Sequence, residues 1–148
     1  MKKTIILTMA FALFIFFSSF ALESLAWRPP PKPGGGLALY VKKHNYQVGE
    51  TVKFMLYKHA GVDDTPANLE GSYYVISKKK DNNKWREFYT SRKNPFGTTL
   101  NLETPLVWTW DQKDNERTHR AKPGEWRLRF FAPKGNISEP LKVKFTIR

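Results

Sequence analysis

Large apolar side chains alternate with polar ones in two stretches of the chain, Leu106–Trp110 and Glu125–Phe131. Successive side chains of a β-strand point to opposite sides, so each stretch is predicted to be a strand with one buried face. A polar segment ending in Pro123-Gly124 separates them and has the composition of a turn. We therefore expect an antiparallel pair joined by a long loop. It would bring three tryptophans to the centre of the core: Trp108, Trp110 and Trp126.

The same alternation predicts further strands, separated by turn-forming residues, and no stretch has the 3.6-residue period of a helix. Two of these strands, Ser72–Lys79 and Trp85–Thr90, are close enough in sequence to form a hairpin. The others are Leu37–Lys43, Thr51–Lys58, Thr98–Glu103 and Leu141–Arg148. Seven or eight short strands in residues 37–148 predict an all-β antiparallel sandwich, with a small barrel as the alternative.

The first 26 residues have the order of a secretory signal. Lys2 and Lys3 precede an apolar run, Ile5–Phe20, and small residues follow it up to Ala26. The run is shorter than the ~20 residues that a membrane-spanning helix needs, so cleavage after Ala26 is expected, with an uncleaved anchor as the alternative. Residues 27–36 are rich in proline and glycine and are predicted to be a linker. The sequence thus predicts a secreted or cell-envelope protein with no transmembrane span after signal removal.

The chain is strongly basic, with a formal net charge of +12. The predicted signal contributes Lys2, Lys3 and Glu23, so a charge of +11 remains on the rest of the chain. A basic surface attracts anionic partners, which include envelope polymers, lipid headgroups, acidic proteins and nucleic acid. The chain has no cysteine, which excludes disulfides, thiolate metal ligands and a cysteine nucleophile.

Sequence motifs of catalysis are missing: there is no G-x-S-x-G elbow and no glycine loop that opens a helix to bind phosphate. A hard cation can be bound by carboxylate oxygens such as those of Asp111, Asp114 and Glu116. The favoured interpretation is that these residues form turns by hydrogen bonding to the nearby backbone. Metal-ligand spacing is also lacking among the histidines, which are expected on the surface or in loops: His44, His59 and His119. We therefore expect no enzymatic activity, metal or cofactor.

The most informative functional feature is a group of cations in the last two predicted strands. Alternation places Arg127 and Arg129 opposite the core in one strand, and Lys142 and Lys144 opposite it in the other. If the strands are neighbours, these side chains form one basic face. Arginine and exposed aromatic residues are typical of recognition surfaces, and a solubilising surface is the alternative. Arg148 is expected as a fifth cation of this face, with Tyr74 and Phe131 as aromatic residues among the cations. Four further cations are expected to extend it: Lys78, Lys79, Lys80 and Arg86.

Two motifs resemble those of bacterial immunoglobulin-like domains. The first is Y-x-x-G-E-x-V-x-F at Tyr46–Phe54, and the second combines W-D-x-x-D at Trp110–Asp114 with P-G-x-W at Pro123–Trp126. The pattern is similar to the bacterial intracellular proteinase inhibitor (BsuPI-like) family and to the Ig-like domain of flagellar hook-cap proteins. The resemblance implies an immunoglobulin-like β-sandwich from about Val41 to Arg148.

The expected function is that of an exported, non-enzymatic binding module whose partner is a protein, an anionic envelope polymer or a lipid surface. The resemblance implies an alternative, a proteinase inhibitor. A trypsin-like pocket would accept Arg117 or Arg120 of the long loop, and a chymotrypsin-like pocket would accept Phe96. Lys58–Gly61 stands where the inhibitor family has an asparagine-centred strand end, and this departure favours the binding module. Nucleic-acid binding is a third and less favoured hypothesis, which would use the basic face with Tyr74, Trp85 or Phe131 for stacking.

Overall fold

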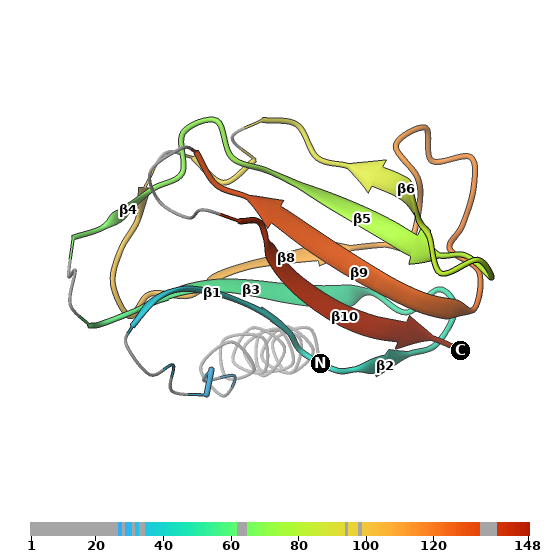
Figure 1. The fold of residues 1–148 in the computed structure, drawn as a ribbon, viewed down its shortest axis with the longest axis horizontal. Coiled ribbons are helices and arrows are strands. Elements are labelled where there is room, and N and C mark those ends of the chain that lie inside the picture. The colour runs from blue at the N-terminus through green and yellow to red at the C-terminus, as the bar shows by residue number, and fades with distance from the viewer. Residues whose placement is uncertain are drawn as a thin grey trace, which may run out of the picture. The chain divides into compact units, whose positions relative to one another are not determined.

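The computed structural model of the chain describes residues 27, 29–30, 32, 35–61, 65–93, 95–97, 99–133 and 139–148. The predicted signal, residues 1–26, lies outside them, as does much of the predicted linker. The described residues from Lys32 onward belong to one compact unit, Pro31–Arg148. All regular secondary structure in the described part of this unit is β-structure (Figure 1).

The described residues form ten strands. In chain order they are β1 Gly36–Val41, β2 Asn45–Tyr46, β3 Val52–His59, β4 Ala67–Asn68, β5 Tyr73–Lys79, β6 Trp85–Thr90, β7 Thr99–Leu100, β8 Leu106–Trp110, β9 Gly124–Phe131 and β10 Leu141–Ile147.

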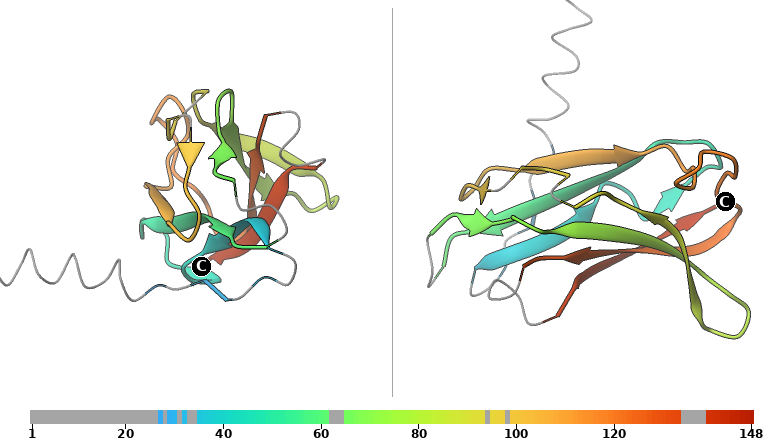
Figure 2. Two further views of the ribbon diagram at one scale, coloured as in Figure 1. Left: turned by 90° about the vertical axis from the view of Figure 1, so that its left-hand side faces the viewer. Right: turned by 90° about the horizontal axis from the view of Figure 1, so that it is seen from above.

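The long strands pack as two layers. One sheet has the order β1-β3-β8 and the other has the order β2-β10-β9-β5-β6, while β4 and β7 pair separately. Figure 2 shows the two sheets as separate layers of the sandwich. All pairs are antiparallel except the short β2–β10 pair. This arrangement is that of an immunoglobulin-like sandwich, and the predicted all-β sandwich class is confirmed.

The predicted pairing of Leu106–Trp110 with Glu125–Phe131 is wrong. Strand β8 pairs with β3 in the three-stranded sheet, whereas β9 lies between β5 and β10 in the other. The segment 111–123 therefore crosses from one sheet to the other. Alternation identifies which side of a strand is buried, but it does not identify the neighbouring strand.

The tryptophans nevertheless meet, because the inner faces of the two sheets pack against each other. The rings of Trp110 and Trp126 have centroids 5.5 Å apart, and Phe88 lies 5.1 Å from Trp126, edge to face. Trp126 is fully buried, and Trp108 packs at the margin of the same cluster. The predicted tryptophan-centred core is confirmed, although the tryptophans come from both sheets.

The predicted hairpin is also confirmed, with one irregularity. Strands β5 and β6 pair with a shift of register at Ile76 and Ser77. The shift is a β-bulge, which gives one strand an extra residue and changes the direction of its side chains. As a result Phe88 and Tyr89, adjacent in β6, both pack against the core.

The crossing segment 111–123 is anchored by Gln112. This side chain is fully buried, and its Nε2 donates to the carbonyl oxygens of Gln47 (2.8 Å) and Glu50 (2.7 Å). Its Oε1 accepts a hydrogen bond from the backbone N–H of Gly49 at 2.7 Å. The amide thus uses its donors and its acceptor on the turn that leads into β3. This contact fixes the crossing segment relative to the three-stranded sheet.

Candidate functional site: the outer face of the five-stranded sheet

The candidate site is the side of the five-stranded sheet that points away from the core, called the outer face below. Pairing of β9 with β10 places Arg127 opposite Lys144 and Arg129 opposite Lys142. The alternate residues of β9, including Trp126, are buried. The sequence prediction that these four cations share one face is therefore correct.

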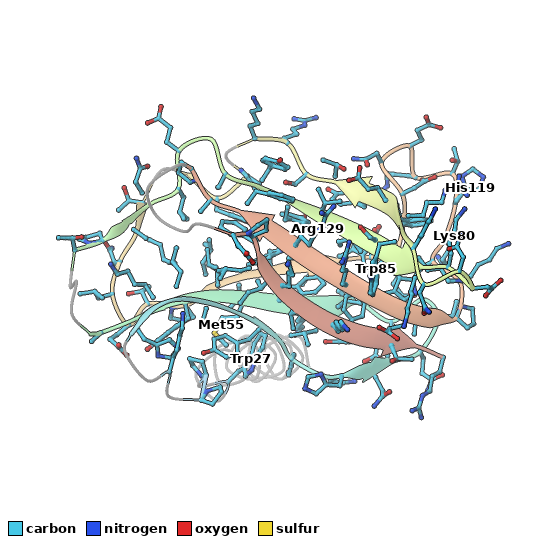
Figure 3. The ribbon with its side chains drawn as sticks, viewed as in Figure 1. Trp27, Met55, Lys80, Trp85, His119 and Arg129 are labelled. Atoms are coloured by element: carbon cyan, nitrogen blue, oxygen red, sulfur yellow. The ribbon has the colours of Figure 1, made fainter. Side chains whose placement is uncertain are left out.

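Aromatic rings lie among these cations. The guanidinium carbon of Arg127 is 4.2 Å from the centroid of the Trp85 ring, and that of Arg129 is 5.2 Å from the Phe131 ring. Phe131 stacks on Tyr73 with centroids 4.6 Å apart and an interplanar angle of 6°. Figure 3 shows Arg129 and Trp85 over strands β9 and β5. Each guanidinium is thus held against a ring, which restricts its orientation.

Two carboxylates partly balance the positive charge. Arg129 Nη2 lies 3.2 Å from Glu87 of β6. Glu125 pairs with Lys79 at 3.3 Å and with Lys144 at 3.8 Å. Within the described residues Arg127 and Lys142 make no ion pair, so their charge is uncompensated. By strand register the face holds more cations than carboxylates: Lys79, Arg127, Arg129, Lys142 and Lys144 against Glu87 and Glu125.

The two arginines cover the middle of the sheet. Beneath them, Val75 and Ser77 of β5 are buried although both point to the outer face, where they pair with Arg129 and Arg127. The Oγ of Ser77 and the Nε atoms of both arginines are buried without a hydrogen-bond partner among the described residues. Burial, and secondly the positive charge of Arg129, lowers the pKa of the Arg127 guanidinium. The site therefore combines closely spaced cations with two arginine N–H donors that have no hydrogen-bond partner among the described residues.

Other predicted members of the face differ in position. Phe131 lies on it, as predicted. Tyr74 does not: it is buried in the core, stacked on Tyr89 and Phe96, and burial raises the pKa of its hydroxyl. Strand β5 is buried on both sides, so its sequence lacks the alternation that would reveal its inner face. Arg148 is exposed just beyond β10, where its backbone pairs with Tyr46.

The candidate inhibitory residues differ in their exposure to solvent. Phe96 is partly buried, with its ring 4.6 Å from Trp108 and 6.3 Å from Phe130, so its side chain packs on the core and is not presented as a protease pocket would require. Hydrophobic residues in loops pack on the core when they can reach it, and sequence alone does not reveal this reach. Arg117 and Arg120 are exposed in the crossing segment, as the alternative requires.

The acidic residues of the crossing segment serve its turns. Asp114 Oδ1 accepts hydrogen bonds from the backbone N–H groups of Thr118 (2.9 Å) and His119 (3.2 Å), and Arg117 pairs with Asp111 at 2.6 Å. Desolvation raises the pKa of Asp114, but hydrogen bonds led by that of the His119 side chain outweigh it, so the pKa is lowered. No group of three or more metal-ligating side chains occurs in the described ranges.

The expectation that all histidines lie on the surface or in loops is wrong for one of them. His59 ends strand β3 and is buried, with its Nε2 2.7 Å from the Tyr40 hydroxyl and its ring 4.6 Å from Tyr57. His44 and His119 are exposed. Within the described residues there is no helical segment of the length and apolar character required to cross a bilayer.

Sequence reasoning missed several contacts of the outer face, and it considered Trp85 only as a base-stacking residue in the nucleic-acid hypothesis. Trp85 and Glu87 alternate in β6 on the side opposite Phe88, and that spacing was the signal available. This spacing does not show that Trp85 and Glu87 contact Arg127 and Arg129, because β5 lies between β6 and β9 in the sheet. Two other members were missed, Tyr73 of β5 and Glu125 of β9. Lys79 was expected to extend the face and does, whereas Lys78 and Arg86 pair with each other at the alternate position and so point to the other side.

Comparisons with known proteins give only distant similarity. No protein-family model matches the chain, and no curated protein matches its sequence. Among solved structures, the chain is similar to a mutant β-glucosidase from Listeria innocua in complex with laminaribiose, with 8% identity and a TM-score of 0.42 over 80% of this chain and 17% of that one. The same enzyme in complex with gluconolactone gives 8% identity and a TM-score of 0.41 with the same coverages. The chain thus spans 17% of the length of these proteins.

Proposed function

We propose that this chain is a non-enzymatic binding module that acts outside the cytoplasm and binds an anionic partner through the outer face. The observation that carries this proposal is the β9–β10 register, which sets Arg127 against Lys144 and Arg129 against Lys142. Like charges directly opposite each other in a sheet are unfavourable in the free protein. A partner that supplies negative charge relieves this repulsion. The location outside the cytoplasm rests on the signal-like order of residues 1–26.

The arrangement of the arginines supports binding over simple solubilisation. A solubilising surface intersperses both signs of charge and leaves long side chains free. Here Arg127 is held against Trp85 and Arg129 is held between Phe131 and Glu87. Binding a partner to side chains that are already ordered costs less conformational entropy. The ring contacts therefore prepare the guanidinium groups for recognition.

A salt series tests the proposal. The purified protein is titrated with phosphatidylglycerol vesicles and with a linear phosphate polymer at increasing salt concentration. Binding that depends on the outer face loses affinity steeply, because neutralised anionic groups release their counterions. Failure to bind any anionic vesicle or polymer at low salt would remove the basis of the proposal.

The proteinase inhibitor is retained as a second candidate because the crossing segment is rigidly held and exposed. Gln112 ties the beginning of the segment to the turn before β3, Asp114 accepts hydrogen bonds from the backbone of Thr118 and His119 within it, and Arg117 and Arg120 are exposed on it. Its weakness is that Arg117 has a left-handed backbone, with φ of 60°, whereas sheet-type peptide recognition uses extended segments. Inhibition of trypsin that is lost in Arg117→Ala or Arg120→Ala and is insensitive to salt would favour this candidate instead.

A further inference from the structure

The aromatic rings of the outer face are engaged within the protein. Trp85 is covered by the Arg127 guanidinium, and Phe131 contacts both Tyr73 and Arg129. A single-stranded nucleic acid stacks its bases on open ring faces, and a membrane-binding surface inserts aromatic side chains into the lipid interface. A ring face that a guanidinium occupies is not open to a base or to lipid, so these contacts compete with both uses. Among the described residues, the outer face therefore offers chiefly N–H donors and positive charge to a partner, and its rings are already in contact with guanidinium groups.

The cations form a regular array. Arg127 with Lys144 and Arg129 with Lys142 are cross-strand pairs, whose Cβ atoms are about 4.5–5.5 Å apart in an antiparallel sheet. The two pairs are separated by two residues along each strand, or about 6.6–6.8 Å. Each pair combines one guanidinium and one ammonium group. The array thus repeats one mixed pair along the strand direction.

A phosphodiester group matches one mixed pair. It carries one negative charge on two free oxygens, so one oxygen can accept from the planar guanidinium fork while the other contacts the ammonium. Successive groups of a flexible phosphodiester chain can take up the spacing between pairs, because several bonds rotate between them. A single carboxylate, by comparison, is already supplied to Arg129 by Glu87 and to Lys144 by Glu125.

We infer that the partner is a linear phosphodiester polymer without aromatic bases, such as a polyol phosphate of the cell envelope; this inference rests on the proposed function. One phosphate occupies the pair Arg127 and Lys144, and the next occupies the pair Arg129 and Lys142. Trp85 is a positioning residue, since it orients Arg127 and does not contact the polymer. The buried Nε donors of the two arginines become usable if phosphate draws the guanidinium groups outward.

Four probes of matched charge distinguish the partners: poly(glycerol phosphate), single-stranded poly(dT), polyglutamate and phosphatidylglycerol vesicles. Dissociation constants are measured with the purified protein at several salt concentrations. Poly(glycerol phosphate) is expected to bind at least as tightly as poly(dT). It is expected to bind more tightly than polyglutamate by about tenfold or more, the effect of one additional charge-assisted hydrogen bond. Tighter binding of poly(dT), equal binding of polyglutamate, or binding confined to vesicles would overturn the inference.

Variants locate the phosphates. The pair variant Arg127→Gln with Lys144→Gln, and the pair variant Arg129→Gln with Lys142→Gln, are each expected to reduce the salt slope for poly(glycerol phosphate) by about 0.7, the value for one phosphate of a single strand. Trp85→Leu is expected to weaken poly(glycerol phosphate) and poly(dT) by the same factor. A much larger loss for poly(dT) would mean that Trp85 stacks on bases, and would contradict the inference. If none of the four probes binds, the proposed function itself fails, whereas tight binding of the wrong probe rejects only the partner.

Discussion

The two faces of strand β9 carry opposite kinds of side chain within the same eight residues. On the inner face Trp126, Leu128 and Phe130 are fully buried and pack against the rest of the core. On the outer face Arg127 and Arg129 are partly exposed and contact residues of β6 and β9. Residues that stabilise this domain and residues proposed to bind a partner therefore lie on different faces of one strand. Substitutions on the inner face should unfold the domain, while those on the outer face should change what it binds.

The largest effect is expected from Trp126→Ala. This side chain is fully buried between Trp110 and Phe88, and truncation of a large buried aromatic residue leaves a cavity. We predict a loss of about 3–5 kcal/mol in the free energy of unfolding. Chemical denaturation followed by circular dichroism measures it. A loss below about 1 kcal/mol would show that the inner face has been assigned to the wrong side.

Two buried serines differ in their hydrogen bonding. Ser91 Oγ accepts from the backbone N–H of Tyr74 at 2.9 Å and donates to the carbonyl oxygen of Arg92 at 3.0 Å, whereas Ser77 Oγ, on the outer face, has no partner among the described residues. Ser91→Ala is predicted to cost about 1–3 kcal/mol because it leaves a buried N–H unpaired. Ser77→Ala is predicted to be neutral or slightly stabilising. Equal losses in the two variants would mean that Ser77 does bind a partner, such as an ordered water.

A smaller effect is expected from Trp85→Leu on the outer face. The substitution removes the contact with Arg127, which is worth about 0.5–1 kcal/mol at a partly exposed site. Trp85→Phe keeps a ring beneath the guanidinium and should retain part of that stability. Denaturation midpoints of the two variants provide the measurement. If Trp85→Leu were as destabilising as Trp126→Ala, the outer face would be part of the core.

The smallest effect is a pH dependence that arises away from both faces of β9. The pKa of Glu103 is lowered from 4.5, because the Tyr57 hydroxyl donates to Oε2 (2.5 Å) and the Ala60 N–H donates to Oε1 (2.7 Å). A carboxyl group with a lower pKa in the folded protein contributes stability above its unfolded pKa, and this is lost as the pH falls through the folded pKa.

The melting temperature of the wild type should therefore fall more steeply than that of Glu103→Gln between about pH 5 and pH 3. The variant keeps an amide oxygen that can accept one of the two hydrogen bonds, so it controls for the loss of charge alone. Parallel melting profiles would contradict a role for the Glu103 charge.

The alternation of apolar and polar residues predicted the strands well, because a long strand with one exposed face has a polar residue at every second position. The predicted Glu125–Phe131 and Leu141–Arg148 differ from β9 and β10 by one residue at an end. The directions of Arg127 and Lys144 followed from the same period. Their common face needed one further assumption, the pairing of these two strands, and the structure confirms it.

Three parts of the structure could not be predicted from the pattern. The partner of β8 depends on how a long segment crosses between sheets, and no local residue encodes that choice. Tyr74 was placed on the wrong face because β5 is buried on both sides. Phe96 lies in a loop without periodicity, so its contact with Trp108 follows only from the three-dimensional fold. Trp85 lies on the outer face because the β-bulge changes the direction of the side chains in β6. It can contact Arg127 because only β5 lies between β6 and β9.

The central claim is that the outer face, and not basicity in general, binds the anionic partner. The most direct measurement compares two variants that each lose four positive charges, titrated with poly(glycerol phosphate) at low salt and at increasing salt concentrations. The test variant replaces the array with glutamine: Arg127, Arg129, Lys142 and Lys144. The matched control replaces two arginines and two lysines that are exposed in loops: Arg92, Lys93, Arg120 and Lys122.

Both variants should keep the wild-type circular dichroism spectrum, since all the replaced side chains lie outside the core. We predict that the test variant loses most of its affinity and that its salt dependence flattens, while the control stays within about threefold of the wild type, or less than 1 kcal/mol. Equal losses in the two variants would mean that only net charge matters. A test variant that binds like the wild type would show that the outer face is a solubilising surface.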